Sequence, residues 1–220
     1  MNVLEQHEIC ESGHRILDPF TEEKLLLVGD VCRLEPGHRQ LDLACGKGEM
    51  LCRWAQRFAI VGVGVDVSDV FVDAARARAA ELGVVELVRF ERGDAASFEA
   101  EAASYDVVSC IGATWIGGGL VGTLRLMTPF LRPGGLLLVG EPYWTEEPPD
   151  AACSGLEVGK DDFASLVGTL DRFESAGAEL VEMVLADGDS WDRYVAAQWW
   201  NVAEWLHTNP ADARADEMRR

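Results

Sequence analysis

DLACGKG, residues 42–48, is a glycine-rich stretch between a predicted strand and a predicted helix. The strand covers residues 40–44, and the helix covers residues 49–58, where apolar side chains recur at helical spacing. A second apolar run, residues 60–65, completes a β-α-β unit. Glycines at such a turn let backbone N–H groups and a helix N-terminus approach an anionic group of a ligand. The stretch therefore predicts a parallel sheet with a ligand site at its carboxyl edge.

Strand and helix predictions alternate along most of the chain. Ser68 is placed to cap a helix over residues 69–82, and Gly83 follows as its C-terminal cap. The turn at residues 132–135, Arg-Pro-Gly-Gly, is expected to stop a helix before the next strand. The pattern predicts an α/β fold, a Rossmann-like, doubly wound and mostly parallel sheet with helices on both faces. The remaining strands are expected at residues 87–91, 106–109, 136–140 and 179–185, and the remaining helices at residues 120–131, 162–176 and, capped by Ser190, 190–207.

Length and composition are those of one globular domain. The chain has 220 residues, of which 48% are hydrophobic and 26% are charged, which predicts a single domain over residues 1–220. Residues 1–35 are expected to form a helical segment that covers the ligand site. Residues 143–160 are rich in proline, glycine and acidic residues and are expected to form a loop or lid.

The formal net charge of -19 restricts the partners of the protein. A field of this sign repels nucleic-acid phosphates and anionic lipid headgroups, so no nucleic acid and no membrane partner is expected. A neutral or cationic small molecule suits the field better. Residues 1–10 contain no apolar core of signal-peptide length, and no apolar run elsewhere approaches a membrane span, so we expect a cytoplasmic protein with its six cysteines reduced. The cysteines lack the spacing of a zinc site, and no metal is expected.

Acidic residues follow two further predicted strands. Asp66 ends the second strand, about 20 residues beyond Gly46, where an acid would reach the hydroxyls of a ribose. Asp94, followed by Ala95, comes after the third strand, and its carboxylate suits the exocyclic amine of an adenine. A nicotinamide-binding G-x-G-x-x-G pattern that starts at Gly46 would need glycine at position 51, where this chain has Leu51. This difference weakens the interpretation as a nicotinamide-binding fold.

Several stretches together carry a family resemblance: Leu41-Asp42-Leu43-Ala44-Cys45-Gly46-Lys47-Gly48, Gly64-Val65-Asp66-Val67-Ser68, Gly93-Asp94-Ala95, Cys110-Ile111-Gly112-Ala113-Thr114-Trp115, Leu131-Arg132-Pro133-Gly134-Gly135, Glu141-Pro142-Tyr143-Trp144 and His14-Arg15-Ile16-Leu17-Asp18-Pro19-Phe20-Thr21. Over nearly its whole length the chain resembles the class I S-adenosylmethionine-dependent methyltransferases, and within them a bacterial branch that acts on small molecules. The resemblance implies S-adenosyl-L-methionine as the cofactor and a small molecule as the methyl acceptor.

The resemblance also implies a role for each strand end. The glycine loop surrounds the methionine part of the cofactor, the second strand end contacts the ribose, and the third contacts the adenine. The backbone carbonyl of Cys110 lies near the methionine amino group, with a purely structural role as the alternative. Many relatives have glycine in place of Ala44, a mild change if φ is negative there. The cofactor-binding residues expected from the resemblance are Asp42, Ala44, Gly46, Gly48, Asp66, Val67, Asp94, Ala95 and Cys110.

Methyl transfer is an in-line displacement that needs alignment, a water-poor pocket and, for a protonated acceptor, a base. The candidates to contact or deprotonate the acceptor are Glu141, which ends the fifth strand, Tyr143 and His14. The alternative for each of them is a structural role. Trp115 and Trp144 stand next to strand ends and are the aromatic candidates for a pocket wall.

The last predicted helix is rich in aromatic residues. Its residues Trp191, Val195, Trp199, Val202 and Leu206 fall on one helical stripe, which predicts that this stripe packs into the core. Tyr194 and Trp200 lie off the stripe, and core packing does not explain them.

Class I methyltransferases usually have a final antiparallel strand between strands five and six. After His207 this chain has no apolar run that could form it. Strand six cannot bond strand five across a vacant position about 10 Å wide, twice the usual strand spacing. We therefore expect a sheet without the final antiparallel strand, either because the chain is cut short of the natural gene product or because strand six docks elsewhere.

Two other functions stay open at this point. One is a nicotinamide-dependent oxidoreductase on a related fold, and the other is a non-catalytic protein that binds S-adenosylmethionine. The acceptor, the atom that is methylated and the oligomeric state do not follow from the sequence.

Overall fold

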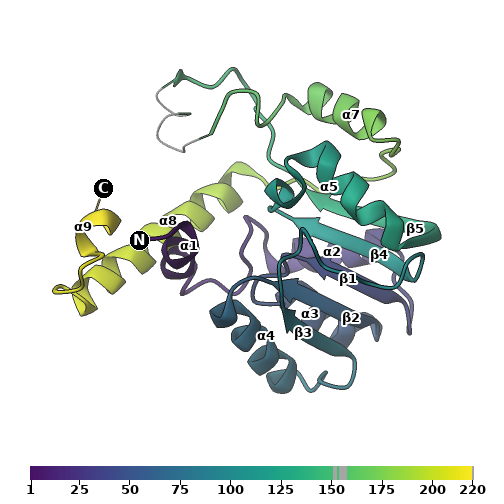
Figure 1. The fold of residues 1–220 in the computed structure, drawn as a ribbon, viewed down its shortest axis with the longest axis horizontal. Coiled ribbons are helices and arrows are strands. Elements are labelled where there is room, and N and C mark those ends of the chain that lie inside the picture. The colour runs from purple at the N-terminus through teal and green to yellow at the C-terminus, as the bar shows by residue number, and fades with distance from the viewer. Residues whose placement is uncertain (151–152, 154–157, 220) are drawn as a thin grey trace.

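The structure is a computed structural model that describes residues 1–150, 153 and 158–219. Its centre is a five-stranded parallel sheet with the strand order β3-β2-β1-β4-β5 (Figure 1). The strands are β1 (Arg39–Leu43), β2 (Val61–Asp66), β3 (Val88–Arg92), β4 (Tyr105–Ile111) and β5 (Leu131–Gly140). The helices are α1 (Val3–Cys10), α2 (Glu22–Val31), α3 (Glu49–Phe58), α4 (Asp69–Glu81), η1 (Thr114–Gly117), α5 (Leu120–Met127), η2 (Thr128–Phe130), α7 (Leu166–Ser175), α8 (Gly188–Thr208) and α9 (Ala215–Met218).

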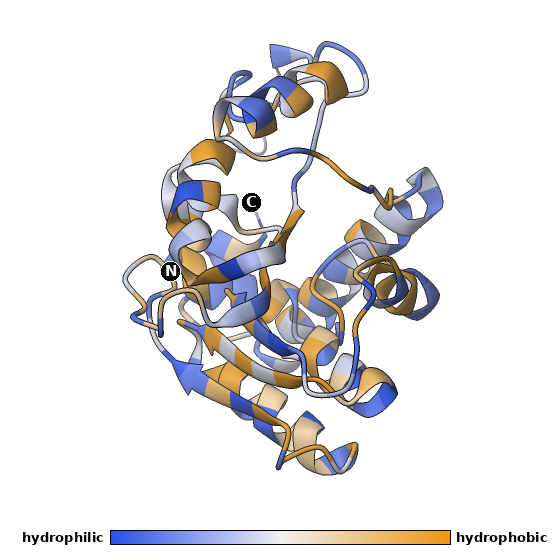
Figure 2. Cartoon of the chain, turned by 90° about the vertical axis from the view of Figure 1, so that its right-hand side faces the viewer, coloured by the Kyte–Doolittle hydropathy of each residue, from blue (hydrophilic) through white to orange (hydrophobic). Residues whose placement is uncertain are grey.

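Helices cover both faces of the sheet, as predicted. The chain leaves β1 for β2 in one direction and β4 for β5 in the other, so right-handed crossovers place their helices on opposite faces. One apolar cluster contains the buried Leu51 and Trp54 of α3 together with residues of α2 and α4. The other contains Val65 of β2 and Met127 of α5. Figure 2 shows the strands between these layers mainly in the orange of hydrophobic residues. The α/β class and the Rossmann-like topology are thus confirmed.

The caps and ends of three helices test the local predictions. Ser68 caps α4, as predicted, because its side chain accepts a hydrogen bond from a backbone amide of the first turn. The predicted cap of α8 is wrong, because the N-cap is Asp187, whose carboxylate accepts the Ser190 amide at 2.9 Å. The helix expected to reach residue 131 ends at Met127, because Pro129 lacks the N–H that would continue it.

β5 begins earlier than the sequence predicts and contains the predicted turn. Tyr105 of β4 pairs with Leu131, and Val107 pairs with Leu136, so the register shifts between them. Residues 132–135 form the bulge, where Gly134 takes a φ of +78° that suits glycine.

The strand predicted at residues 179–185 is wrong. Among the described residues the sheet ends at β5, and the segment pairs with no strand. Its side chains Leu180, Val181 and Met183 are 43%, 72% and 43% exposed. The apolar residues give the segment a propensity for strand, but a strand forms only where a neighbour pairs its backbone. The expectation of a sheet without a final antiparallel strand is confirmed for the part of the chain that the structure describes.

The predicted core stripe of α8 is also wrong. Trp191 and Trp199 of the stripe are 40% and 72% exposed. Trp200, which lies off the stripe, is 74% exposed. The helix packs against α1 and α9 at one side (Figure 1), where Asn201 is buried, whereas Val195, Val202 and Leu206 of the stripe are only half-buried. α8 is the longest helix at 21 residues, yet no helix in the described ranges is long and apolar enough to cross a membrane.

Candidate functional site

The candidate site lies at the carboxyl edge of the sheet, where β1 and β4 are neighbours. The chain order reverses between these two strands, and in open α/β sheets such a switch point forms the ligand crevice. Asp42 lies near the end of β1, Asp66 ends β2, Cys110 lies near the end of β4, and Glu141 follows β5. The topology therefore brings the predicted strand-end residues to one edge.

The glycine loop turns the chain from β1 into α3. Gly46 and Gly48 have φ angles of +53° and +67°, which favour glycine. A Cβ on Gly48 would lie 2.5 Å from the Phe90 ring and 2.8 Å from the Ala75 side chain, so no larger residue fits there without a shift. Gly48 is also the N-cap of α3 and offers no side chain to the first turn. The amides of that turn are therefore left for a ligand.

Ala44 departs from the sequence-based expectation. Its φ is +58° rather than negative, so it adopts the left-handed conformation that costs a non-glycine residue about 1 to 2 kcal/mol. The left-handed turn is imposed by the loop around it, where the Cys45 amide bonds the Val65 carbonyl at 2.9 Å. The strain is localised at the candidate ligand loop.

Asp66 connects the glycine loop to the start of α4. One carboxylate oxygen accepts the Gly46 amide at 2.8 Å, and the other accepts the Ser68 amide at 2.9 Å. Burial raises the pKa of Asp66, and these two N–H groups oppose the rise. Because each carboxylate oxygen has more than one lone pair, the group keeps capacity to accept a hydroxyl.

A hollow of about 150 Å³ lies directly beyond Asp66. It is lined by Val67, Arg92, Gly93 and Asp94, so the structure brings together the predicted ribose and adenine strand ends. Val67 is 51% exposed, which leaves an apolar side chain open to a flat ring.

Ala95 and Cys110 differ from the other predicted cofactor residues. Their side chains are 7% and 0% exposed and belong to the apolar core. Any ligand contact they make must therefore come from the backbone. Cys110 is one of six cysteines, all of them free, and burial raises its pKa to about 12.

Asp42 stands at the centre of the edge and is 3% exposed. Ser109 donates its hydroxyl to Asp42 Oδ1 at 2.6 Å, and the Gln40 side-chain amide donates to Ser109 Oγ at 2.9 Å. Burial raises the pKa of Asp42 to about 7 against the effect of the Ser109 hydrogen bond, and the nearby Asp66 adds to the rise. The sequence pattern did not indicate Gln40 or Ser109, because the two lie on different strands, β1 and β4, and only the folded sheet brings them to Asp42.

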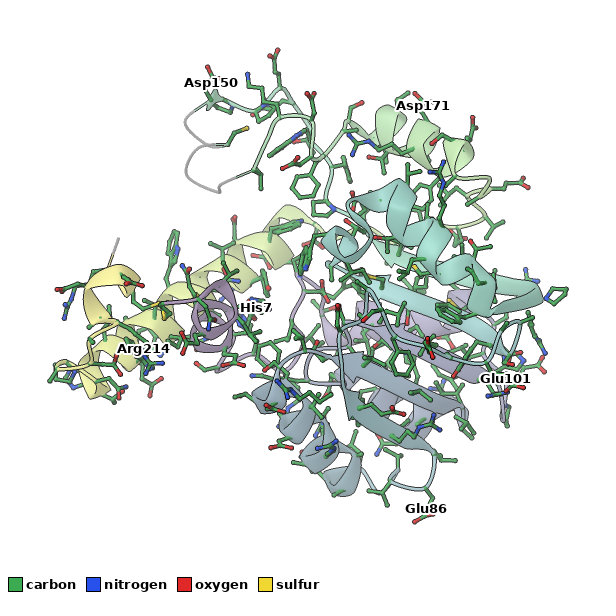
Figure 3. All side chains as sticks on the ribbon, in the orientation of Figure 1. His7, Glu86, Glu101, Asp150, Asp171 and Arg214 are labelled. Atoms are coloured by element: carbon green, nitrogen blue, oxygen red, sulfur yellow. The ribbon has the colours of Figure 1, made fainter. Side chains whose placement is uncertain are left out.

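Residues 8–18, which we call the cap, lie over the glycine loop. Lys47 Nζ donates to the carbonyls of Glu11, Ser12 and His14 at 2.7, 2.9 and 2.7 Å. The side chain of Leu17 lies so close to Gly46 that a Cβ there would be 2.6 Å from it. Beside the cap, His7 of α1 (labelled in Figure 3) packs edge-on against the Phe71 ring of α4, with ring centroids 5.4 Å apart.

Glu11 fixes the cap to α8, a role that no local sequence pattern indicates. Its buried Oε1 accepts hydrogen bonds from Tyr194 at 2.7 Å and Gln198 at 2.6 Å, and its Oε2 lies 2.9 Å from His14 Nδ1. Burial would raise the pKa of Glu11, but the close approach of His14 and the hydrogen bonds from Tyr194 and Gln198 outweigh it and hold the pKa below its usual value. The Tyr194 hydroxyl also lies 3.1 Å from the Leu17 carbonyl, so its single hydrogen is shared between the two acceptors. These contacts explain why Tyr194 lies off the helical stripe.

The three predicted acceptor residues do not form one cluster of hydrogen bonds. Glu141 is half-buried and accepts the Thr114 hydroxyl at 2.7 Å, while His14 is engaged by Glu11 in the cap. Tyr143 makes no side-chain hydrogen bond within the described ranges. Burial raises the pKa of Glu141, and the Thr114 hydrogen bond and the Arg172 charge oppose the rise.

The two tryptophans predicted near the pocket differ. Trp115 lies in η1, directly after β4, and is 70% exposed. Trp144 packs edge-on against Phe163 at 5.8 Å and donates to the Lys160 carbonyl at 3.2 Å. Trp115 is therefore the aromatic side chain left open beside the switch point. The predicted lid falls partly on residues 151–152 and 154–157, outside the described residues.

Comparisons with known proteins agree with this geometry. Residues 41–135 match the model of a family described as a methyltransferase domain. The protein YjhP of Escherichia coli (strain K12) is 46% identical over all of this chain and 89% of its own length. A crystal structure of a SAM-dependent methyltransferase from Geobacter sulfurreducens in complex with S-adenosyl-L-homocysteine superimposes with a TM-score of 0.93 at 47% identity, covering 98% of this chain and 87% of that one. The 27-O-demethylrifamycin SV methyltransferase of Amycolatopsis mediterranei (strain S699) is 31% identical over 78% of this chain and 63% of its own length.

Proposed function

The chain belongs to the class I S-adenosylmethionine-dependent methyltransferases, and on that basis we propose that it methylates a small-molecule acceptor by in-line transfer from S-adenosyl-L-methionine. The observation that carries the proposal is the environment of Asp66. This carboxylate joins the glycine loop to α4 beside a hollow lined by Val67 and Asp94. Hydroxyl acceptors and an exposed apolar surface within one small region suit an adenosine.

The residues of the carboxyl edge fit the cofactor. We assign Asp66 to the ribose hydroxyls, Val67 and Asp94 to the adenine, and the loop around Gly46 to the methionine part. The uncapped first turn of α3 supplies free amides near that loop, and the left-handed glycines leave room for close approach of a ligand.

When bound, the cofactor supplies an electrophilic methyl group on a sulfonium. The chain contributes alignment and exclusion of water, for which the cap held by Lys47 over the glycine loop is placed. Glu141 is the candidate that the geometry favours for accepting a proton from the acceptor, because burial raises its pKa towards the range of a useful base. Tyr143 is a candidate for contact with the acceptor, and His14, held by Glu11, is assigned to positioning of the cap.

A small neutral or cationic acceptor is supported by two observations. The net charge of -19 opposes the approach of polyanions. The methyltransferase from Amycolatopsis mediterranei carries the name of a small-molecule acceptor, 27-O-demethylrifamycin SV. Trp115, exposed next to β4, offers such an acceptor an aromatic surface.

The comparisons do not favour a nicotinamide-dependent oxidoreductase. Leu51, which stands where the third glycine of that fingerprint would be, is a fully buried core residue of α3. A non-catalytic S-adenosylmethionine-binding protein differs from the proposed enzyme only in turnover.

Two measurements test the proposal in sequence. Calorimetry is expected to give binding of S-adenosyl-L-homocysteine and no binding of nicotinamide dinucleotides; the opposite preference would overturn the proposal. Methyl-labelled cofactor is then incubated with the protein and either a small-metabolite extract or a macromolecular fraction. Label is expected in the small-metabolite fraction, and Glu141→Gln is expected to reduce it. Binding without any transfer would support the non-catalytic alternative, and label only in macromolecules would contradict the small acceptor.

A further inference from the structure

Asp18 of the cap places a carboxyl group at the switch point between β1 and β4. It lies against Gly112, which follows the last residue of β4: a Cβ on Gly112 would be 2.5 Å from Asp18 Oδ1. Gly112 has a φ of +67°, and its amide bonds the Gly140 carbonyl at 3.0 Å, so it extends the sheet edge towards β5. A residue from the N-terminal segment thus reaches the carboxyl ends of the two central strands.

The charges of other acids act on the carboxyl of Asp18, which has no cationic partner among the described residues. Burial raises the pKa of Asp18 to about 8, and the negative charges of Asp42 and Glu11 add to the rise. Burial and the charges of Asp42, Asp18 and Glu141 all raise the pKa of the Cys110 thiol near the end of β4. Within the described ranges, Asp18 accepts no side-chain hydrogen bond and forms no ion pair.

The cationic side chains of this region are committed elsewhere. Lys47 bonds three carbonyls of the cap, and His14 faces Glu11. Neither one lowers the pKa of Asp18, whereas the Arg172 charge opposes the rise that burial causes in the pKa of Glu141. A positive group that enters here would lower the raised pKa values of Asp18 and Asp42 and favour their ionised forms, because Coulomb attraction is stronger in a partly desolvated place than in water.

The backbone on both sides of Asp18 is fixed. The Leu17 carbonyl accepts the Tyr194 hydroxyl at 3.1 Å, and the Leu17 side chain packs on Gly46. On the other side, the Phe20 amide donates to the Asp18 carbonyl at 2.7 Å. These contacts hold the backbone that carries the Asp18 carboxyl beside the switch point.

We infer that Asp18 is a cofactor-binding residue whose carboxylate contacts a cationic group at the methionine end of S-adenosyl-L-methionine. The inference rests on the proposed function. The cofactor has two such groups, the sulfonium and the α-ammonium, and both belong to the part assigned to the loop that Leu17 covers. The acceptor candidates Glu141 and Trp115 lie towards β5 and η1, whereas Asp18 lies against Gly112, and burial and the Asp42 charge raise its pKa.

The test measures the dissociation constants of S-adenosyl-L-methionine and S-adenosyl-L-homocysteine for the wild type and Asp18→Asn by calorimetry. Glu23→Gln is the matched control, because it makes the same change in net charge at an exposed residue of the same segment. Asp18→Asn is expected to raise the dissociation constant of S-adenosyl-L-methionine about tenfold or more, the equivalent of about 1.4 kcal/mol. Glu23→Gln is expected to leave this dissociation constant within about twofold of the wild-type value.

The second ligand identifies the cation. S-adenosyl-L-homocysteine has the ammonium but no sulfonium. An equal loss of affinity for both ligands in Asp18→Asn therefore assigns Asp18 to the ammonium, and a loss of affinity for S-adenosyl-L-methionine alone assigns it to the sulfonium. Unchanged binding of both ligands to Asp18→Asn, or to Asp18→Ser if the first variant does not fold, would overturn the inference and leave the proposed function standing. Failure of the wild type to bind either ligand would overturn both.

Discussion

Replacement of Ala44 by glycine is expected to stabilise the protein. Ala44 has a φ of +58°, and relief of this left-handed strain is worth about 1 to 2 kcal/mol. Glycine also has more freedom in the unfolded chain, which costs about 0.5 to 1 kcal/mol, and the loss of a half-buried methyl costs about 0.4 kcal/mol more. The net expectation is a gain of about 0.5 kcal/mol in the free energy of unfolding, where most glycine substitutions destabilise.

Ala77→Gly is the matched control. Ala77 is exposed in the interior of α4 and is absent from the residues with positive φ, so the same chemical change there costs about 1 kcal/mol. Both variants change the unfolded chain in the same way, so their difference of about 1.5 kcal/mol isolates the conformation of the folded loop. It corresponds to about 4 °C in Tm for a domain of this size.

Urea denaturation of the wild type and the two variants measures this difference directly. The expected order of stability is Ala44→Gly, then wild type, then Ala77→Gly. Equal losses in both variants would refute the reasoning, because they would show that Ala44 is not strained in the folded protein.

Three further outcomes follow from named contacts. Glu11→Ala is expected to lower the free energy of unfolding by about 3 kcal/mol in chemical denaturation, because it removes a fully buried carboxylate that accepts hydrogen bonds from the half-buried Tyr194 and Gln198. Since the pKa of Glu11 is lowered in the folded state, its contribution is fully present above its usual value of 4.5 and is lost as the pH falls through the folded value, so wild type and variant should converge in acid. Arg78→Ala is expected to lower the free energy of unfolding by about 3 kcal/mol, because it breaks a largely buried bidentate pair with Glu49 at 2.7 Å. Arg89→Ala, which removes a largely exposed pair with Glu91, is expected to change it by less than about 0.5 kcal/mol, and equal effects of the two variants would contradict this. Lys47→Met is expected to speed hydrogen exchange in residues 8–18 without changing exchange in β1, and unaltered exchange in the cap would argue against its role as a clamp.

Local sequence signals were sufficient for the centre of the fold and the cofactor edge. The β-α-β unit follows from apolar periodicity and glycine spacing, which both act over a few residues. Asp66 was found because a strand end is visible in the sequence and the sheet brings parallel strand ends together. The α3 helix has the predicted bounds for the same reason.

Local sequence patterns did not predict the features that depend on contacts between residues far apart in the chain. Glu11 and Tyr194 are 183 residues apart, and nothing local in either indicates the contact that fixes the cap. Asp18 has the same difficulty, because its environment is made by Asp42 and Gly112. The segment 179–185 has a propensity for strand but no partner strand among the described residues. The aromatic stripe of α8 has the period of a core helix, but this helix packs mainly against α1 and α9.

The role of Asp66 is the central claim, and one binding measurement tests it most directly. The dissociation constant of S-adenosyl-L-homocysteine is compared by calorimetry for the wild type, Asp66→Asn and the control Asp73→Asn, an exposed acid of α4. Hydrogen bonds to a charged group are worth about 1.5 to 3 kcal/mol, so Asp66→Asn is expected to bind about 10-fold to 100-fold more weakly, with Asp73→Asn unchanged. Binding of wild-type strength by a folded Asp66→Asn would contradict the account.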